Sequence, residues 1–414
     1  MNSLMTPSWV RKVLILIVAV VLFSIEGLTA GAESKDADLL KETWQAYKHR
    51  YIQQDGRVKD PGAQDVSTSE SQSYAMLRAV WMDDRATFDR TYQWSINNLQ
   101  VRGDKLFAWR WGKQQNGNWG PLDRTAASDA DEDIALALLM AHQRWQVEQY
   151  RTDALALLND LWEKETVQTP LGPVLLPGDW DWSKIPVKND EGKRHQRLRK
   201  RRINPSYFAP YAYRVFAQAD PRHPWMQLVD SSYEILRRST YQSFTRLPSD
   251  WIELDLVSST LTPYDDPRDT RGDFGYEAFR TFWRIGLDKL LNPTEQRAWA
   301  FLKNGTVLRD YWVIHNTLPG PLSLSGVQRG RLTSLSIYGG VLPALQSSDP
   351  AIAEAVYQKI FLSNLKSGIW QPSKDYYAQN WLWFGVLTHH ASIKPTSKSS
   401  KQSVLTRILL LHQD

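Results

Sequence analysis

Apolar side chains recur along this chain at the three- and four-residue spacing of α-helices, and the segments that carry them alternate between two kinds. Segments of the first kind are apolar on nearly all sides and begin near residues 70, 129, 205, 276, 331 and 376. Segments of the second kind are amphipathic and begin near residues 39, 85, 147, 224, 293 and 351. Because a helix that is apolar all round must be buried, the pattern predicts six inner and six outer helices.

The loops between these segments are long at one end of the helices and short at the other. Two concentric rings of helices satisfy this connectivity. The sequence therefore predicts an all-α fold, an (α/α)6 barrel of six inner and six outer helices, over residues 35–392. The inner helices of such a barrel run parallel to one another, so their N-termini meet at one face.

Caps and breakers give the approximate bounds of the elements. The stretch with Trp109, Trp111 and Trp119 is predicted to be a loop, as are residues 247–274. Beyond the helices that open at Glu70 and Asp129, the predicted helices span residues 39–51, 85–99, 146–162, 205–216, 224–239, 275–291, 293–302, 330–345, 351–362 and 375–387.

Two inner helices carry acidic residues in their first turn. Ser128 is the predicted N-cap of the helix that holds Asp129, and three further acids follow closely. Ser69-x-x-Gln72 fits a capping box, which places Glu70 in the first turn of another helix. The helix dipole favours acids at such positions, so each acid taken alone has an ordinary structural explanation.

A third acid, Glu277, lies at the start of the fourth inner helix, which gives all three acids an equivalent position. Parallel inner helices would bring Glu70, Asp129 and Glu277 into one cleft. Such carboxyls suit glycosidic bond hydrolysis, in which one protonates the leaving oxygen and another activates water or attacks the sugar. Glu70 is the candidate acid, and burial beside Asp129 must raise its pKa by more than the helix dipole lowers it.

Aromatic residues are the candidate sugar contacts. The chain has 19 Trp and 17 Tyr, and flat rings can stack on sugars, although any single ring is as often part of the core. Arg280 lies one turn after Glu277 and could hold that acid or a sugar hydroxyl; an ordinary helix pair is the alternative. The aromatic candidates are Trp109, Trp111, Tyr207, Tyr276 and Tyr377.

Composition narrows the chemistry further. The 414 residues include no cysteine, which excludes disulfides, thiolate metal sites and cysteine nucleophiles. None of the eight histidines forms a His-Glu-x-x-His motif, so a zinc hydrolase is not expected. We expect the protein to use neither a metal nor a cofactor.

The net charge of +5 comes from one segment, since residues 188–202 contain eight Lys or Arg and two acids. The rest of the chain is nearly neutral, which argues against binding to nucleic acid. A solvated surface is the ordinary interpretation of the basic segment. The alternatives are contact with an anionic membrane surface or with an acidic polymer.

The first 32 residues have the pattern of a signal peptide. Arg11 and Lys12 precede an apolar run at residues 13–25, and Ala30-Gly31-Ala32 fits a cleavage site. The run is short for a membrane span, so an uncleaved anchor is the less favoured alternative. The sequence thus predicts export, to the periplasm or beyond, and a separate tail at residues 393–414 with no readable role.

Two motifs around the acids resemble a known family. The run Ala127-Ser128-Asp129-Ala130-Asp131-x-x-Ile134-Ala135-x-Ala137-Leu138-Leu139-x-Ala141-x-x-x-Trp145 matches the signature of glycoside hydrolase family 8 at every specified position. Thr68-Ser69-Glu70-x-Gln72-Ser73-Tyr74 resembles the acid-bearing motif of that family. The likeness covers most of residues 44–385, including Asn204-Pro205-Ser206-Tyr207 and Asp250-Trp251. It is greatest to the secreted endoglucanases that accompany bacterial cellulose synthesis.

The resemblance implies an (α/α)6 barrel that cleaves β-1,4-glucan with inversion. Glu70 would be the proton donor, and Asp129 would hold and distort the sugar at the point of cleavage. The resemblance also implies a monomer that associates transiently with a cellulose-synthesis complex.

One residue departs from the family pattern. The family's base is an Asp within Tyr-Asp-Ala-x-x-Arg, whereas this chain has Tyr276-Glu277-Ala278-Phe279-Arg280. Glutamate is one methylene longer and would close part of the gap that inverting enzymes keep for water. Asp273 is the alternative base. Ser71 stands where the family has Gly, and its Cβ is expected to crowd the floor of the cleft.

Two alternatives follow from these differences and from the limits of the motifs. The first alternative is a protein that has the hydrolase fold and binds glucan but no longer cleaves it. Glu277 and Ser71 are the residues that suggest this alternative. The second keeps the chemistry and changes the polymer to chitosan, xylan or mixed-linkage glucan, because loop packing sets the shape of the sugar subsites.

Overall fold

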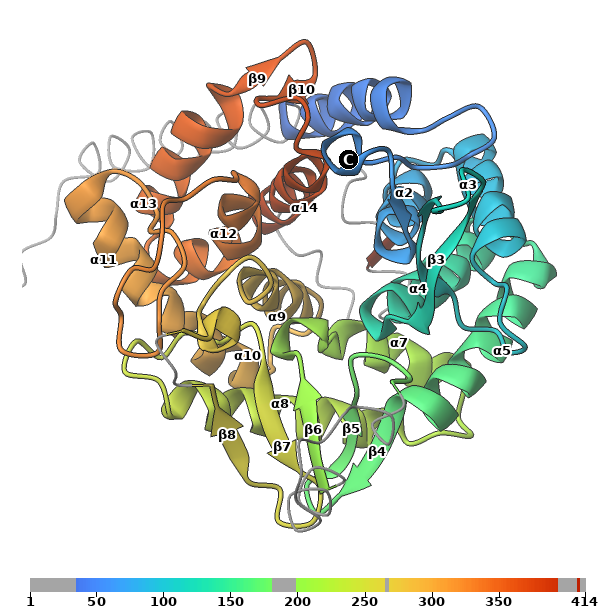
Figure 1. Cartoon of the computed structure of the whole chain (residues 1–414). Helices are drawn as coiled ribbons and strands as arrows, with labels where there is room; N and C mark the ends of the chain where they lie inside the picture. The colour runs from blue at the N-terminus through green and yellow to red at the C-terminus, as the bar shows by residue number, and fades with distance from the viewer. Residues whose placement is uncertain (1–34, 181–198, 265–267, 394–407, 410–414) are drawn as a thin grey trace, which may run out of the picture.

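The structure, a computed structural model, describes residues 35–180, 199–264, 268–393 and 408–409. Viewed down its axis, one set of helices surrounds the centre and another lies outside it (Figure 1). The inner helices are α2 (Ser69–Trp81), α4 (Ser128–Trp145), α7 (Pro210–Ala219), α9 (Phe279–Leu291), α12 (Ser336–Ser348) and α14 (Tyr376–Ile393). The outer layer contains residues 35–51, α3 (Arg85–Asn98), α5 (Glu148–Glu165), α8 (Trp225–Tyr241), α10 (Gln296–Leu302), α11 (Thr306–His315) and α13 (Pro350–Val356). The predicted (α/α)6 barrel is confirmed.

The inner helices are buried because they are apolar or small-sided on all faces. In α4 every residue from Ser128 to Ala141 is buried. In α12, a Cβ at Gly339 would come within 2.0 Å of the Trp381 carbonyl oxygen, and a Cβ at Gly340 within 2.1 Å of the Phe279 ring. These glycines let α12 lie directly against α14 and α9.

The first and last parts of the barrel pack together and close the ring. Arg78 of α2 donates hydrogen bonds to Asn380 of α14 (3.1 Å) and to the carbonyl of Thr43 (3.4 Å). The Trp383 indole of α14 donates to the carbonyl of Leu40 (3.1 Å). Helix α14 therefore bridges the N-terminal outer helix and the first inner helix.

Short antiparallel strands, which were not predicted, occupy several loops between the helices. The tryptophan-rich stretch predicted as a loop is a hairpin of β2 and β3, and β2 also pairs with β1. The strands are β1 (Ser67–Thr68), β2 (Ala108–Lys113), β3 (Trp119–Ala126), β4 (Thr166–Thr169), β5 (Gly172–Leu175), β6 (Lys200–Ile203), β7 (Ile252–Asp255), β8 (Leu261–Pro263), β9 (Leu365–Lys366) and β10 (Ile369–Trp370).

Three inner helices begin later than the sequence predicts. Asn204 caps a 3-10 turn, Pro205–Tyr207, and α7 starts only at Pro210. Helix α9 starts at Phe279 and α12 at Ser336, so Glu277 lies in the turn before its helix. Helix α11 was not predicted at all. Further 3-10 turns lie at Pro61–Ala63, Thr270–Gly272 and Lys303–Gly305, and a π-helical segment at Tyr357–Leu362 follows α13.

The predicted cap of α4 is wrong by one residue. Ala127 is the N-cap, and it makes no side-chain capping bond. The Ser128 hydroxyl instead donates to the carbonyl of Leu176 (2.6 Å), a tertiary partner that sequence spacing does not reveal. Asp129 still lies in the first turn of the helix.

The capping box of α2 is also shifted by one residue. Thr68 is the N-cap and pairs reciprocally with Ser71. Gln72, predicted as part of the box, is fully buried, and its side-chain oxygen accepts a hydrogen bond from the Val58 amide (2.6 Å). Glu70 keeps its predicted place in the first turn.

The predicted signal peptide lies outside the described residues, as do most of the basic segment and most of the C-terminal tail. In the described part of the chain, no helix combines the length and apolarity needed to cross a membrane. Two tail residues are described, Ile408 and Leu409, and both are buried. The Trp81 indole donates to the Ile408 carbonyl (2.9 Å), and Arg144 donates to the Leu409 carbonyl (3.0 Å).

Candidate active site

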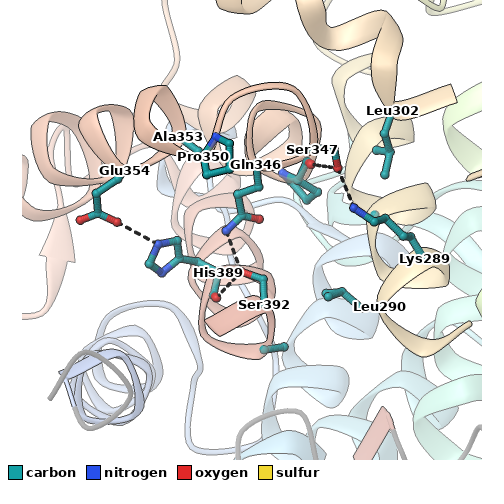
Figure 2. Close-up of a pocket in the computed structure, with 13 residues that line it drawn as sticks. Lys289, Leu290, Leu302, Gln346, Ser347, Pro350, Ala353, Glu354, His389 and Ser392 are labelled. Atoms are coloured by element: carbon teal, nitrogen blue, oxygen red, sulfur yellow. Dashed lines mark hydrogen bonds and ion pairs between the residues drawn. The ribbon is translucent and has the colours of Figure 1, made fainter. Parts of the chain in front are cut away.

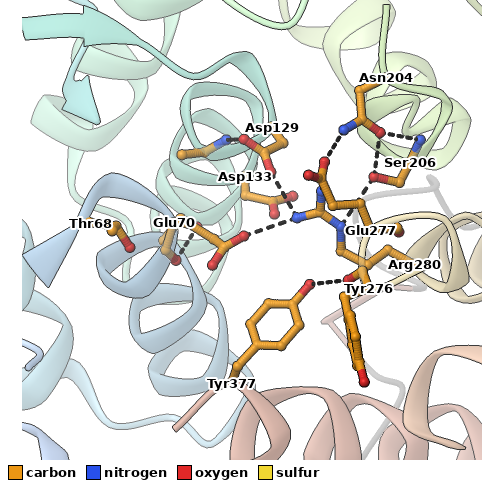
Figure 3. Close-up of polar contacts among 12 residues, drawn as sticks. Thr68, Glu70, Asp129, Asp133, Asn204, Ser206, Tyr276, Glu277, Arg280 and Tyr377 are labelled. Atoms are coloured by element: carbon orange, nitrogen blue, oxygen red, sulfur yellow. Dashed lines mark hydrogen bonds and ion pairs between the residues drawn. The ribbon is translucent and has the colours of Figure 1, made fainter. Parts of the chain in front are cut away.

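The three acids that the sequence places at equivalent helix starts do meet, and one arginine joins them. Arg280 Nη1 lies 2.9 Å from Glu70 Oε2 and 3.2 Å from Asp129 Oδ2. Arg280 Nη2 lies 3.2 Å from Glu277 Oε2. Figure 3 shows the guanidinium between the three carboxyls. The predicted convergence is therefore confirmed, and Arg280 contacts all three acids.

Each acid comes from the N-terminal end of an inner helix. Glu70 and Asp129 lie in the first turns of α2 and α4, and Glu277 lies two residues before α9 begins. The inner helices surround one central space, so these ends face a common centre (Figure 1). The barrel thus positions the acids through the direction of its helices.

Glu70 has surroundings that favour its protonated form. Its side chain is 22% exposed, and its Oε1 accepts a hydrogen bond from the Tyr376 hydroxyl (3.1 Å). Burial raises the pKa of Glu70 to about 7; the negative charges of Asp129 and Glu277 add to this rise, while Arg280 and Tyr376 oppose it. Burial and the neighbouring acids therefore raise the pKa of Glu70 by more than Arg280 and Tyr376 lower it.

Asp129 is the most deeply placed of the three acids, with 3% of its surface exposed. Its Oδ1 accepts a hydrogen bond from the Ala130 amide (3.0 Å), and its Oδ2 contacts Arg280. A buried carboxylate needs such a charged partner, because leaving it unpaired is costly. Asp129 is therefore held rigidly beside Glu70.

The other acids of the same run point elsewhere. Asp131 Oδ1 accepts a hydrogen bond from the Phe107 amide (3.0 Å). Arg284 Nη1 lies 3.0 Å from Asp133 Oδ1 and 3.3 Å from Glu132 Oε1, and burial raises the pKa of both acids. Within the described stretches of the chain, no cluster of three or more His, Asp or Glu is arranged to hold a metal ion.

Glu277 is the most exposed acid, with 33% of its side chain accessible. Asn204 Nδ2 donates to its Oε2, and the Trp251 indole donates to its Oε1 (3.3 Å). Burial raises the pKa of Glu277 and Asp129 adds to the rise, whereas Arg280, Asn204 and Trp251 lower it. Three donors from three parts of the chain therefore hold this carboxyl.

Asp250 fixes the turn that carries Glu277. Its Oδ1 accepts hydrogen bonds from the amides of Gly275 (3.1 Å), Glu277 (3.1 Å) and Ala278 (2.7 Å). A Cβ at position 275 would lie 2.3 Å from Asp250 Oδ2, so only glycine allows this approach. Burial raises the pKa of Asp250 to about 7, and the charge of Glu277 adds to the rise, while the three amides oppose it.

Four residues around the acids were not predicted as site residues: Asn204, Asp250, Trp251 and Tyr376. The only signal for the first three was their place in stretches that share the family resemblance. Asn204, Asp250 and Trp251 lie in loops far along the chain from the acids they contact. Spacing rules therefore could not find them.

The acids line a cleft of about 300 Å³. Every predicted sugar-contacting residue except Trp111 also lines it. The full lining is Thr68, Ser69, Glu70, Trp109, Ala127, Asp129, Tyr207, Tyr276, Glu277, Arg280 and Tyr377. A larger cavity of about 440 Å³ lies at the other ends of the inner helices, beside Lys289 and His389 (Figure 2), and none of these acids lines it.

The tyrosines of the cleft are held by polar contacts. The Tyr377 hydroxyl donates to the Tyr276 carbonyl (3.2 Å), and the Tyr276 hydroxyl lies 2.5 Å from Thr333 Oγ1. The Arg280 guanidinium lies 5.2 Å from the centre of the Tyr207 ring. Arg280 therefore covers part of Tyr207 and leaves less of that ring for a sugar.

Trp111 does not line the cleft, contrary to the prediction. It is 9% exposed and packs against Trp119 (ring centres 5.3 Å apart), Trp94 (5.2 Å) and the Arg57 guanidinium (4.4 Å). A regular strand would put Trp109 and Trp111 on one face. The pairing of β2 with β3 shifts register between these two residues, and such an irregularity turns successive side chains to different sides.

Asp273 does not reach the cleft either, so it is not an alternative base. It is 2% exposed, and its Oδ1 lies 3.0 Å from Arg329 Nε. Ser71 exchanges hydrogen bonds with the N-cap residue Thr68 and is not part of the cleft lining. Its Cβ therefore does not crowd the floor of the cleft. Glu277 is the carboxyl that faces Glu70 across Arg280.

The sequence also matches a known family of enzymes. Residues 17–389 fit the family profile described as Glycosyl hydrolases family 8. The chain belongs to glycosyl hydrolase family 8. It is therefore a glycoside hydrolase, as the motifs predicted.

Relatives within the family 8 hydrolases agree with this assignment. The endoglucanase of Escherichia coli (strain K12) is 34% identical over 274 residues, which are 65% of this chain and 68% of that protein. The endoglucanase of Pseudomonas fluorescens (strain SBW25) is 35% identical over 260 residues, 60% of this chain and 61% of that protein. The crystal structure of endo-1,4-D-glucanase from Vibrio fischeri ES114 matches with a TM-score of 0.70 and 27% identity, covering 83% of this chain and 93% of that one.

Proposed function

We propose that this family 8 hydrolase is an endo-β-1,4-glucanase that inverts the anomeric carbon. The observation that carries the proposal is the pair of carboxyls, Glu70 and Glu277, joined by one arginine in an aromatic-lined cleft. The names of the relatives, endoglucanase and endo-1,4-D-glucanase, support the substrate class. The carboxyls indicate the reaction but do not specify a polymer, so the substrate class rests on the names of the relatives.

Glu70 serves as the general acid in this mechanism. It gives its proton to the glycosidic oxygen as the bond from that oxygen to the anomeric carbon breaks. A general acid must still hold its proton at working pH, and the raised pKa of about 7 meets that need. The Tyr376 hydroxyl then stabilises the carboxylate that remains.

Glu277 serves as the general base. It takes a proton from the water that attacks the anomeric carbon from the opposite side of the sugar ring. Both carboxyls contact one guanidinium, so their nearest oxygens are at most about 8 Å apart, compatible with the roughly 6.5–9.5 Å of inverting enzymes. The proton later returns to solvent, and Glu70 is reprotonated.

Asp129 and the aromatic residues bind the sugar. Asp129 is held beside Glu70 by Arg280, so it can hold a hydroxyl of the sugar at the cleavage point and favour a distorted ring. Trp109, Tyr207, Tyr276 and Tyr377 supply flat faces for the neighbouring sugars.

The biological setting belongs to the same proposal. The basic and apolar pattern of residues 1–32 supports export, secreted or periplasmic, with or without removal of the leader. The resemblance to endoglucanases that accompany cellulose synthesis supports a role in cellulose production or trimming, as a monomer that meets the synthesis complex transiently.

Release of reducing ends from carboxymethyl cellulose tests the proposal. Wild-type protein should release them, and α-anomeric products should appear first by NMR, because inversion of a β-linkage gives the α-anomer. Glu70→Gln and Glu277→Gln should each lower kcat at least about 100-fold, as expected when a general acid or base is lost.

Glu163→Gln is the matched control, since Glu163 lies on the outer helix α5 with 65% of its side chain exposed. This variant should match the wild type. Absence of activity in the wild type on carboxymethyl cellulose, or full activity in Glu70→Gln, would sink the proposal. Activity restricted to chitosan, xylan or mixed-linkage glucan would keep the mechanism and replace the polymer.

The second candidate is a glucan-binding protein without turnover. The observation that favours it is Glu277 itself, which is one methylene longer than the aspartate that the family resemblance implies at this position. This candidate predicts that cello-oligosaccharides bind without being cleaved and that Glu277→Asp creates activity. The inverting glucanase predicts instead that the wild type already turns over.

A further inference from the structure

Two side chains outside the family's acid motifs donate hydrogen bonds to the Glu277 carboxyl. Asn204 Nδ2 donates to Oε2 of Glu277, and the Trp251 indole donates to Oε1 (3.3 Å). In Figure 3, Asn204 and Glu70 lie on opposite sides of the Glu277 carboxyl. Hydrogen bonds to an ionised carboxylate are stronger than neutral ones, so these donors fix where the carboxyl lies.

The orientation of the Asn204 amide follows from its own partners. Asn204 is 1% exposed, and its Oδ1 accepts hydrogen bonds from the Ser206 amide (3.0 Å) and hydroxyl (2.7 Å). The oxygen end is thereby assigned to Ser206, which leaves the NH2 end for Glu277. The Ser206 hydroxyl also accepts from Arg280 Nε (3.1 Å), so the four side chains form a closed set.

Trp251 is fixed by both its neighbour and its ring contacts. Asp250 binds three amides of the turn that carries Glu277, so one dipeptide holds both the backbone and the side chain of that residue. The Trp251 ring lies 5.9 Å from Trp180 and 6.2 Å from Tyr207, centre to centre. The indole N–H therefore has little freedom to leave the carboxyl.

We propose that Asn204 and Trp251 are positioning residues that hold the Glu277 side chain back from Glu70, so that room remains for the attacking water. The inference rests on the proposed function, in which Glu277 is the base. It explains how a glutamate can serve at a position where an extra methylene would otherwise narrow the gap.

Trp251→Phe tests the proposal because it removes the indole N–H donor and leaves a smaller aromatic ring at the same position. We expect kcat to fall about tenfold with KM little changed, the usual effect of losing one hydrogen bond to a charged group. The acidic limb of the pH profile should move to higher pH, because the lost donor favoured the ionised base. The other charged or titratable groups that face Glu277 are unchanged in this variant: Arg280, Asp129, Glu70, Asp250, Tyr207 and Tyr377.

A double-mutant cycle separates positioning from general damage. The same Trp251→Phe change in a Glu277→Asp background should cost clearly less than in the wild type, since the shorter side chain does not need to be drawn back. An equal loss in both backgrounds, together with an unmoved acidic limb, would overturn the proposal. Trp299→Phe is the control, because its indole donates to the Pro293 carbonyl on the outer wall (3.2 Å).

A crystal structure of Trp251→Phe combined with Asn204→Ala gives a readout that does not need activity. The Glu277 carboxyl should lie closer to Glu70 than in the wild type. An unchanged carboxyl position would contradict the proposal even if the protein cleaves glucan. Full activity of Glu277→Gln would contradict the base role instead, so the two failures are distinguishable.

Discussion

At the scale of single residues, the site is governed by a competition over the Glu70 proton. Arg280 and the Tyr376 hydroxyl favour the carboxylate, while burial and two neighbouring acids favour the protonated form. The second group is stronger, and the pKa rises to about 7. The same carboxyl at an exposed helix start would be ionised at neutral pH and useless as an acid.

This competition predicts the alkaline side of the pH profile. kcat/KM should fall above about pH 7, because ionised Glu70 cannot donate a proton. Tyr376→Phe removes a hydroxyl that favours the ionised form, so its alkaline limb should move to higher pH. Initial rates on a soluble cello-oligosaccharide would measure the alkaline limb of both the wild type and the variant. A range from about pH 5 to about pH 9 covers the pKa of a carboxyl in an apolar site.

Tyr92→Phe is the matched control for that experiment. Its hydroxyl also donates to a carboxylate, Asp153, at 2.9 Å, but on the outer wall of the barrel. The control should leave the alkaline limb where it is in the wild type. A wild-type profile without a decline above neutral pH would remove Glu70 from the role of general acid.

At the scale of elements, one histidine joins three helices at the end of the barrel away from the cleft. His389 of α14 lies 2.7 Å from Asp36 and 3.3 Å from Glu354 of α13. Figure 2 shows His389 with Glu354. Burial lowers the pKa of His389, but the two carboxylates raise it by more, to about 9. The imidazolium therefore holds the N-terminal outer helix and α13 to α14.

The raised pKa predicts how stability depends on pH. The contribution of His389 is complete below its unfolded pKa of about 6.5 and is lost as pH rises through about 9, which amounts to about 3 kcal/mol at most. Urea unfolding at pH 6, 7.5 and 9.5 should show this decline in the wild type and not in His389→Gln. His315→Gln, an exposed histidine on α11, should retain it. Parallel curves for all three proteins would refute the role of His389.

At the scale of the whole molecule, the two ends of the barrel have separate tasks. The N-terminal ends of α2, α4 and α9 carry the acids, whereas the C-terminal ends of α2 and α4 contact Ile408 and Leu409 of the tail, which are buried. Their carbonyls accept hydrogen bonds from Trp81 and Arg144, at the ends of α2 and α4. At the rise of an α-helix, these ends lie roughly 17 Å from Glu70 along α2 and roughly 22 Å from Asp129 along α4.

This separation predicts a variant that loses stability and keeps its chemistry. Ile408→Ala should lower the free energy of unfolding by about 2–4 kcal/mol, because Ile408 is fully buried, and leave kcat at 25 °C unchanged. Thermal unfolding and glucanase assays on the same preparation measure both quantities. Leu362→Ala, at a 39% exposed position, should change neither. A stable Ile408→Ala protein would mean that the tail does not contribute to the barrel.

The sequence by itself determined the barrel, its helix order and the three acids. Helical periodicity reports burial directly, so six all-apolar segments imply six inner helices. Glu70 and Asp129 could be placed because a first-turn position depends on local caps, and an error of one residue at each cap did not move either acid. The family motifs supplied the proposed roles that spacing alone left open, and the match of residues 17–389 to the family profile confirms the resemblance.

Only the tertiary structure decided which groups surround those acids. Arg280 contacts all three acids because three helix ends meet, and Asn204, Asp250, Trp251 and Tyr376 come from elements that local pattern does not connect. The register shift that turns Trp111 away from the cleft is likewise invisible in the sequence. Local pattern fixes which residues start a helix. Long-range packing fixes what those residues touch, and with it the pKa of each carboxyl and the space left for water.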